Sequence, residues 1–423
     1  MRVVFATFGS LGDLHPYIAI ARELKRRGHR PVIATFEAFR EPVEASSVDF
    51  APLRPSMDGF GDRASVMRRL VDPRRGPEVL VREMFMPHLR ESYEDLERAA
   101  AGADLLVNHP LVFVGPLLAE KHGLPWASTV LAPLSLFSAA DPPVLPGAPW
   151  LRAMRVLGTG AYRFVFRIPR LMMRRWEAPL YRLRGDLGLS VPGPVAQMEG
   201  QYSPALNLAL FSGKFAGRQP DWPPNTVLCG FPRYDGPPPD AATQAALDAF
   251  LASGEPPLVF ALGSSAVLVA DDFWRHAIEA ARRLDQRALL ITGAPPEELG
   301  ALPSSIRVFR YLPYSSAFPH AAAIVHPGGI GTLAQALAAG RPQLIVPVAF
   351  DQPDNARHAV ALGTARSVPF RKATGDAMAR ELSPLLGQAG YAARAASLAR
   401  AIGAEDAAGT ACDALLNRLN RTG

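Results

Sequence analysis

AIVHPGGIGTLAQALAAGRPQLIVPVAFDQPDN, residues 323–355, contains a complete strand–helix–strand unit. Its first three residues are apolar, and together with His326 they predict a buried strand over 323–326. The segment 332–339 has the composition of a helix and is followed by Gly340, a favoured residue just past a helix end. Residues 343–348 predict the next strand. Two strands joined through a helix indicate a parallel sheet with helices on its faces.

The same alternation of strands and helices extends on both sides of this unit. In the first half we predict strands 3–8, 31–35, 104–108 and 126–131, and helices 16–27 and 111–122. In the second half we predict strands 258–262, 288–292 and 306–310, and helix 273–284. The predicted fold class is therefore α/β, with two Rossmann-like parallel-sheet domains.

Two proline clusters, at 219–224 and 236–239, separate the halves. Clustered prolines suit a semi-rigid connection. We therefore predict a first domain over 1–218, a proline-rich linker region over 219–243 and a second domain over 244–403. The alanine-rich C-terminal stretch is helical by composition, with a final helix at about 404–423.

The composition argues against several classes of protein. Hydrophobic residues make up 48% and charged residues 20% of the 423, as in ordinary globular proteins. The sequence lacks the run of about 18 apolar residues that spans a membrane and the apolar core of a signal peptide, so we expect a cytoplasmic protein. The net charge of +6 comes without a basic run interleaved with aromatic residues, so nucleic acid is not an expected partner. Cys229 and Cys412 stand apart without neighbouring ligands, so we expect no metal site.

The glycine-rich turn of the quoted unit predicts a phosphate site. Gly328, Gly329 and Gly331 let backbone N–H groups approach a ligand closely and permit positive φ. The helix that follows begins with unpaired N–H donors and a partial positive charge, which favour a phosphate or pyrophosphate. His326 and Thr332 flank the turn and offer side-chain donors to the same phosphates.

Asp351 and Gln352 follow the next strand, at the sheet edge where ligands bind in open α/β folds. An acid beside an amide suits a polyol, because sugar hydroxyls both donate and accept hydrogen bonds. Each of these features is common by itself, but their order along one unit is far more specific.

Asp13 follows the first predicted strand and a glycine-containing turn at 9–12. Aspartate is a favoured helix cap, and a carboxylate can also serve as a general base, so the residue type leaves both roles open. His15 and His109 lie near the carboxyl ends of predicted strands and are alternative bases.

The stretches 311–314, 326–332 and 346–352, with Asn355, closely resemble the donor-binding motif of the UDP-glycosyltransferase superfamily, the inverting glycosyltransferase family 1. Residues 9–16 resemble its bacterial branch, which includes rhamnolipid-type rhamnosyltransferases and sterol glucosyltransferases. The resemblance covers most of both halves and is weakest from about 140 to 215. It implies the GT-B fold, in which two Rossmann-like domains face each other across a cleft and the final helix crosses back to the first domain.

The resemblance also implies roles for single residues. Tyr311 matches the position that stacks on the donor base, and Asp13 matches the catalytic base. The pair that holds the donor sugar matches Asp351 and Gln352. A loop that reaches the phosphates or the catalytic centre matches Ser264 and Ser265. The pyrophosphate-binding positions match His326, Gly329, Gly331 and Thr332.

Two positions depart from the family pattern. Pro327 replaces the second His or Cys that is common in this motif. Ala334 stands where plant members often carry a ribose-binding Glu, so another group must hold the ribose. The selectivity between uracil and thymine bases therefore stays open.

The segment 151–188 alternates apolar and basic residues, with arginines at 167, 170, 174 and 175. Two interpretations compete: a helical hairpin that flanks the acceptor pocket, with arginine stems over apolar surface, or a peripheral membrane contact on an anionic surface. We favour the hairpin, with a pliable acceptor pocket lined by Phe137, Trp150, Met172 and Met173.

We therefore predict an inverting glycosyltransferase that moves a hexose of glucose or rhamnose type from a UDP- or TDP-sugar to a hydroxyl of an apolar natural product or lipid. The nucleotide sugar is a co-substrate, and we expect no cofactor and no metal. Asp13 takes the acceptor proton, while the helix N-terminus and His326 stabilise the leaving diphosphate. Two alternatives remain: a sugar-nucleotide epimerase of the same fold, and a non-catalytic partner of another enzyme.

Overall fold

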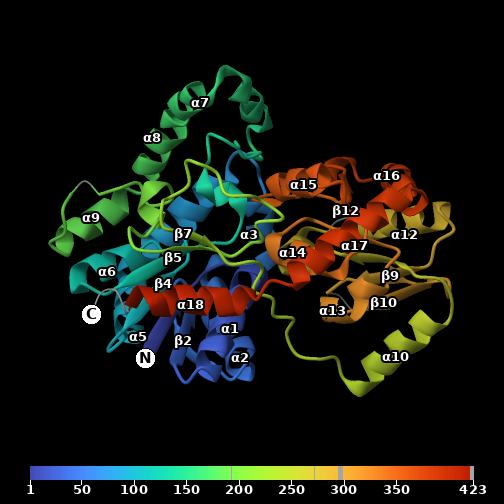
Figure 1. Cartoon of the computed structure of the whole chain (residues 1–423), viewed down its shortest axis with the longest axis horizontal. Coiled ribbons are helices and arrows are strands. Elements are labelled where there is room, and N and C mark those ends of the chain that lie inside the picture. Colours follow the sequence, from blue (N-terminus) through green and yellow to red (C-terminus); the bar gives the residue numbers. More distant parts are fainter. Residues whose placement is uncertain (192, 271, 294–298, 420–423) are drawn as a thin grey trace. The chain divides into compact units, whose positions relative to one another are not determined.

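The protein folds into two α/β units (Figure 1) in a computed structural model that describes the chain except residues 192, 271, 294–298 and 420–423. Unit 1 comprises Met1–Tyr234 and the C-terminal segment from Glu405, and unit 2 comprises Asp235–Ala404. Each unit contains one parallel sheet, which confirms the predicted α/β class. Among the described residues, no helix is long and apolar enough to cross a membrane.

Unit 1 contains a seven-stranded parallel sheet in the order β3-β2-β1-β4-β5-β6-β7. Its strands are β1 (Arg2–Ala6), β2 (Arg30–Thr35), β3 (Asp49–Pro52), β4 (Leu105–Asn108), β5 (Trp126–Val130), β6 (Asn207–Ala209) and β7 (Thr226–Leu228). Its α-helices are α1 (Leu11–Arg26), α2 (Arg40–Ala45), α3 (Arg63–Leu70), α4 (Gly76–Glu78), α5 (Leu89–Ala99), α6 (Gly115–His122), α7 (Thr159–Val165), α8 (Arg167–Trp176), α9 (Ala178–Asp186) and α18 (Ala407–Leu419).

Unit 2 contains a six-stranded parallel sheet in the order β10-β9-β8-β11-β12-β13. Its strands are β8 (Leu258–Ala261), β9 (Ala288–Ile291), β10 (Ile306–Phe309), β11 (Ala323–His326), β12 (Gln343–Ile345) and β13 (Ala365–Ser367). Its α-helices are α10 (Ala241–Ala252), α11 (Gly263–Ala266), α12 (Phe273–Arg283), α13 (Tyr314–Ala317), α14 (Ile330–Ala339), α15 (Gln352–Ala361), α16 (Gly375–Gly387) and α17 (Ala389–Gly403).

Helices cover both faces of each sheet, which explains why the strands read as continuous apolar runs. In β1, Val3 and Phe5 point to one face and Val4 and Ala6 to the other, and all four are fully buried. Helix α18 packs against α1 in unit 1, so the end of the chain completes the first unit (Figure 1).

Strand β7 lies inside the region 219–243 that the proline clusters mark as linker. Its residues pair with β6, with Val227 opposite Leu208. The prolines flank this short apolar run and do not interrupt it, so they leave its backbone N–H groups free to join the edge of the sheet.

Helix α1 begins at Leu11, earlier than the predicted residue 16. Ser10 is the N-cap and accepts a hydrogen bond from the N–H of Gly12, while Asp13 accepts one from the N–H of Ser10. This reciprocal capping box starts the helix upstream of Pro16. Reading Pro16 as the first helical residue missed the stronger signal from Ser10 and Asp13.

Candidate active site

The strand order of unit 1 reverses between β1 and β4, and residues that follow these two strands meet at one sheet edge. Ligands bind at such a reversal in open α/β sheets. Asp13 lies in the first turn of α1, after β1, and His109 directly follows β4. His109 Nε2 and Asp13 Oδ1 are 3.6 Å apart. Of the three predicted bases, the structure brings these two together.

The two carboxylate oxygens of Asp13 have different neighbours. Its Oδ2 accepts hydrogen bonds from the Ser10 backbone N–H at 2.6 Å and from the Ser10 hydroxyl at 3.0 Å. Its Oδ1 faces His109. The close approach requires glycine at position 9, because Gly9 has a φ of +132° and a Cβ there would lie 2.3 Å from Asp13 Oδ2. Capping and proton transfer are therefore compatible roles for one carboxylate.

The ring of His109 is buried and has a defined orientation. Its Nδ1 accepts the backbone N–H of Leu111 at 3.1 Å. The neutral ring therefore carries its proton on Nε2, the atom that faces Asp13. This geometry makes His109 a neighbour of Asp13, and its role as an alternative base stays a prediction.

His15 occupies a different face of α1. Residues two apart on a helix do not face each other, and the His15 ring packs edge-on against Tyr234, with the ring centroids 5.2 Å apart. The structure therefore packs His15 against Tyr234, whereas Asp13 faces His109.

In unit 2 the strand order reverses between β8 and β11, and the glycine-rich turn follows β11. Of the three predicted glycines, Gly328 uses positive φ, at +88°, and a Cβ there would lie 2.7 Å from Ile345 Cγ2. Gly329 is the N-cap of α14, and Gly331 already belongs to its first turn. Because no side chain caps α14, its first N–H groups remain available for the predicted phosphate.

The structure changes the role of His326. Its side chain is fully buried, its Nε2 donates to Gln343 Oε1 at 2.9 Å, and its Nδ1 accepts the N–H of Gly328 at 3.1 Å. Burial lowers the pKa of His326 to about 4, so the ring is neutral near pH 7. Both ring nitrogens are engaged inside the unit, so the predicted donation to the phosphates is not possible in this arrangement. His326 instead fixes the glycine-rich turn.

Asn355 joins this turn to the predicted sugar-binding carboxylate. Its Nδ2 donates to Gly328 O at 2.9 Å and to Asp351 Oδ2 at 2.6 Å. The sequence motif contains Asn355, but our sequence reasoning assigned no role to it or to Gln343. A signal for Asn355 was present, since residues four apart on a helix lie side by side. Gln343 lies 17 residues from His326 in the sequence, and local patterns do not reveal such a pair.

Gln352 presents its amide nitrogen toward the turn. Its Oε1 accepts the backbone N–H groups of Val348 at 2.8 Å and Ala349 at 3.1 Å. Its Nε2 would lie 4.0 Å from a Cβ at Gly329. The structure therefore places Gln352 next to Asp351 and beside the glycine-rich turn, with the NH₂ group as the side that faces the turn.

The loop after β8 reaches the start of α14. Ser264 and Ser265 lie in α11, directly after this strand, and a Cβ at Gly263 would lie 3.3 Å from Thr332 Oγ1. These three predicted donor-site residues therefore gather where the strand order reverses. Tyr311 is 47% exposed, and its hydroxyl donates to Asp235 O at 3.2 Å. An exposed ring held in this way offers a surface for stacking.

Of the four residues predicted to line an acceptor pocket, Phe137 and Met173 are partly buried in unit 1 and Trp150 and Met172 are exposed. Phe137 packs against Phe166, with the centroids 5.7 Å apart. Trp150 and Met172 lie on the surface, 65% and 47% exposed, and Met173 is only partly buried. The alternation of apolar and basic residues reports which positions are apolar, but not whether a pocket or solvent faces them.

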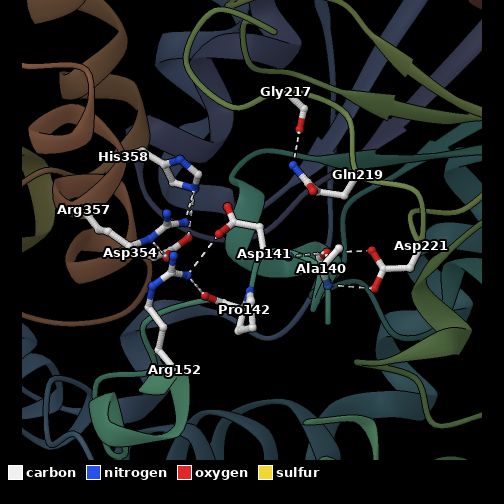
Figure 2. A network of polar contacts seen from close by, with 11 residues as sticks. Ala140, Asp141, Pro142, Arg152, Gly217, Gln219, Asp221, Asp354, Arg357 and His358 are labelled. Carbon is white, nitrogen blue, oxygen red and sulfur yellow. Dashed lines mark hydrogen bonds and ion pairs between the residues drawn. The ribbon is translucent and has the colours of Figure 1, made fainter. Parts of the chain in front are cut away.

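Figure 2 shows ion pairs that lie within each unit. In unit 2 the buried Asp354 follows Asp351 and Gln352, the predicted sugar-binding pair, and contacts Arg357 Nε at 3.0 Å and His358 Nε2 at 3.6 Å. In unit 1, Asp141 in the loop after β5 pairs with Arg152 at 3.1 Å. In the part of the chain that the structure describes, no group of three or more His, Cys, Asp or Glu residues is arranged to hold a metal ion.

Two family models match parts of the chain. Residues 3–134 match the glycosyltransferase family 28 N-terminal domain. Residues 275–413 match the C-terminal domain of the family described as erythromycin biosynthesis protein CIII-like. These ranges contain Asp13 and His109 in the first case, and the glycine-rich turn with Asp351 and Gln352 in the second.

The chain is also similar, over almost its whole length, to known glycosyltransferases. An O-mycaminosyltylonolide 6-deoxyallosyltransferase of Streptomyces fradiae is 33% identical over 97% of this chain and 96% of its own. A solved calicheamicin glycosyltransferase is 19% identical, with a TM-score of 0.69 over 99% of this chain and 98% of its own. A glycosyltransferase of Streptomyces sp. SF2575, complexed with thymidine diphosphate, is 19% identical, with a TM-score of 0.63 over 98% and 99%. The structural likenesses confirm the GT-B fold.

Proposed function

Because the chain belongs to the UDP-glycosyltransferase superfamily and is a nucleotide-sugar-dependent glycosyltransferase, we propose that it transfers a 6-deoxyhexose from a TDP-sugar to a hydroxyl of a macrolide-type natural product. The observation that carries this proposal is the full-length similarity to a 6-deoxyallosyltransferase, whose acceptor is such a compound by name. The thymidine diphosphate bound to a protein of the same fold supports thymine over uracil.

In the proposed reaction, Asp13 Oδ1 takes the proton of the acceptor hydroxyl while that oxygen bonds to the anomeric carbon. The bond from the anomeric carbon to the diphosphate oxygen breaks, and its electron pair leaves with the diphosphate. Attack opposite the leaving group inverts the anomeric centre. His109 Nε2 faces the carboxylate, 3.6 Å from Asp13 Oδ1, and favours its charged form electrostatically. A positioned base typically contributes about 10²–10⁴-fold.

The donor side of the proposal uses unit 2. The first N–H groups of α14 and the Thr332 hydroxyl stabilise the charge that develops on the diphosphate. His326 and Asn355 hold the turn that presents these donors. Asp351 and Gln352 bind the sugar hydroxyls, and Tyr311 stacks on the base. The scheme involves no metal and no further cofactor, because the helix N-terminus supplies the electrostatic stabilisation.

The two alternative functions would leave different products. An epimerase would convert the TDP-sugar without any acceptor, and a non-catalytic partner would leave both compounds unchanged. The name of the relative that is 33% identical favours glycosyl transfer over both alternatives.

The test is a mass-spectrometric screen of the purified full chain. TDP- and UDP-linked hexoses and 6-deoxyhexoses are each paired with macrolides, phenols, sterols and hydroxy fatty acids. We expect the mass of a 6-deoxyhexose to be added to a macrolide when a TDP donor is supplied. NMR should show that the sugar in the product has the anomeric configuration opposite to that in the donor. An epimerised donor without an adduct would support the epimerase alternative. Turnover confined to UDP donors or to lipid acceptors would contradict the proposed substrates.

A further inference from the structure

The segment 149–176, which we call the arginine arm, comprises η6 (Pro149–Leu157), α7 and α8. Figure 1 shows α7 and α8 projecting from the body of unit 1. The two helices are nearly continuous, because the N–H of Phe166 bonds to Tyr162 O and the N–H of Arg170 bonds to Phe166 O. Residues 159–176 therefore behave as one helix with distinct faces.

One face of this helix attaches the arm to unit 1. Tyr162 and Phe166 are four residues apart and are both buried. They form a small apolar cluster with Ala139, against which Phe137 packs. Attachment therefore uses one apolar stripe of the helix.

A second apolar stripe faces solvent. Phe164, Ile168 and Leu171 are 67%, 64% and 57% exposed, and their spacing places them on one helix face. Val156 and Leu157, at the end of η6, are exposed as well. Isolated exposed apolar residues need no explanation, but a continuous stripe of large ones marks a surface that binds something apolar.

The charge around this stripe is of one sign. Between Asp141 and Glu177 the sequence contains seven arginines and no acidic residue. Three of the arginines pair with carboxylates outside the segment: Arg152 with Asp141 (Figure 2), Arg163 with Asp221 and Arg170 with Glu199. The other four, at 155, 167, 174 and 175, form no ion pair with any residue that the structure describes. The surface is therefore both apolar and cationic.

We propose that the arginine arm docks on an anionic lipid bilayer. Its apolar stripe enters the boundary between headgroups and acyl chains, while the four arginines outside ion pairs neutralise lipid phosphates. A convex, projecting helix suits a flat surface better than a closed pocket. A second copy is a poor occupant, because a symmetric contact would set the same arginines against each other. The exposure of the stripe thus favours the membrane interpretation over a hairpin beside a pocket.

The experiment is co-sedimentation of the full chain with vesicles. One set contains phosphatidylcholine alone, and the other contains phosphatidylcholine with phosphatidylglycerol. We expect binding to the anionic vesicles that weakens as salt is raised, because exposed charges are screened. Equal binding to both vesicle types, or none to either, would overturn the proposal.

Two double variants test whether the arginine arm is the surface that binds the vesicles. Phe164→Ser with Leu171→Ser removes the stripe, and Arg167→Glu with Arg175→Glu reverses the charge. We expect each to lower the partition coefficient about tenfold or more. The charge variant keeps the test valid if the serine pair unfolds, which a thermal melt reveals.

Matched controls lie in unit 2. Val360→Ser changes an exposed apolar residue, and Arg282→Glu with Arg400→Glu makes the same change in net charge as the arm variant. We expect both controls to bind like the wild type. An equal loss in the control charge variant would overturn the proposal in favour of general attraction. Self-association in ultracentrifugation that only the arm variants abolish would overturn it in favour of a second copy.

Discussion

At the scale of single residues, Asp13 combines its role in capping α1 with its proposed role as the general base, and substitution can separate the two. Asparagine at this position keeps an oxygen that can accept from Ser10 but does not take a proton. We therefore expect Asp13→Asn to lower kcat about 10²–10⁴-fold and to change the free energy of unfolding by less than about 1 kcal/mol. Asp13→Ala should lose the same activity and, in addition, about 1 kcal/mol of stability as the capping bonds disappear. The measurements are steady-state kinetics and urea unfolding.

Near-normal turnover in Asp13→Asn would show that Asp13 caps the helix but is not the general base. His109→Gln is the companion variant, because it removes the ring that faces Oδ1 and leaves the Ser10 contacts intact. We expect His109→Gln to lower kcat more than it raises the KM for the donor, since His109 lies in the other unit from the predicted donor site.

Buried His326 predicts a particular loss of stability in acid. The pKa of His326 is about 4 in the folded protein, against an ordinary value of about 6.5 for histidine in water. The unfolded chain therefore binds the proton first, and stability falls as pH drops from about 6.5 to about 4. The full loss is about 3 kcal/mol. Urea unfolding across this range should show a flatter pH dependence for His326→Gln than for the wild type. Parallel profiles of stability against pH would mean that His326 is not neutral and buried in the folded protein.

At the scale of elements, the proposed donor site depends on how Asn355 in α15 holds the turn before α14. Asn355→Ala removes the bonds to Gly328 O and Asp351 Oδ2. Each bond contributes about 1 kcal/mol, so we expect the Kd for TDP and the donor KM to rise about tenfold. The KM for the acceptor should not change. Titration calorimetry and kinetics measure these quantities, with Gln388→Ala, an exposed amide of the same unit, as control. An unchanged Kd would show that the turn keeps its shape without Asn355.

The elements also show what sequence reasoning can and cannot reach. Strand β11 was predicted with its observed bounds, because an apolar run that ends at a glycine-rich turn has few other interpretations. The start of α1 and the orientation of His326 were missed, since both depend on side-chain hydrogen bonds that periodicity does not report. The segment 151–188 was predicted as a hairpin that flanks an acceptor pocket, and Phe164, Ile168 and Leu171 within it are exposed, because apolar spacing identifies a face but not what covers it.

At the scale of the whole molecule, the chain leaves unit 1 after Tyr234, forms unit 2 and returns. The returning helix α18 buries Ala411, Cys412 and Leu415 and packs against α1. The first and last segments of the sequence therefore share one core, and the stability of the helix that carries Asp13 depends on residues about 400 positions away.

This arrangement predicts that a substitution in the core of α18 lowers the stability of unit 1. Leu415 is fully buried, so Leu415→Ala should cost about 2–5 kcal/mol of unit 1 stability. Hydrogen exchange followed by mass spectrometry should show faster exchange in α1 and α18, with β11 and α14 of unit 2 unchanged. The exposed Asn417→Ala is the control and should behave like the wild type. TDP binding should persist in Leu415→Ala, because the predicted donor residues all belong to unit 2. Equal loss of protection in both units would instead show that they unfold as one cooperative body.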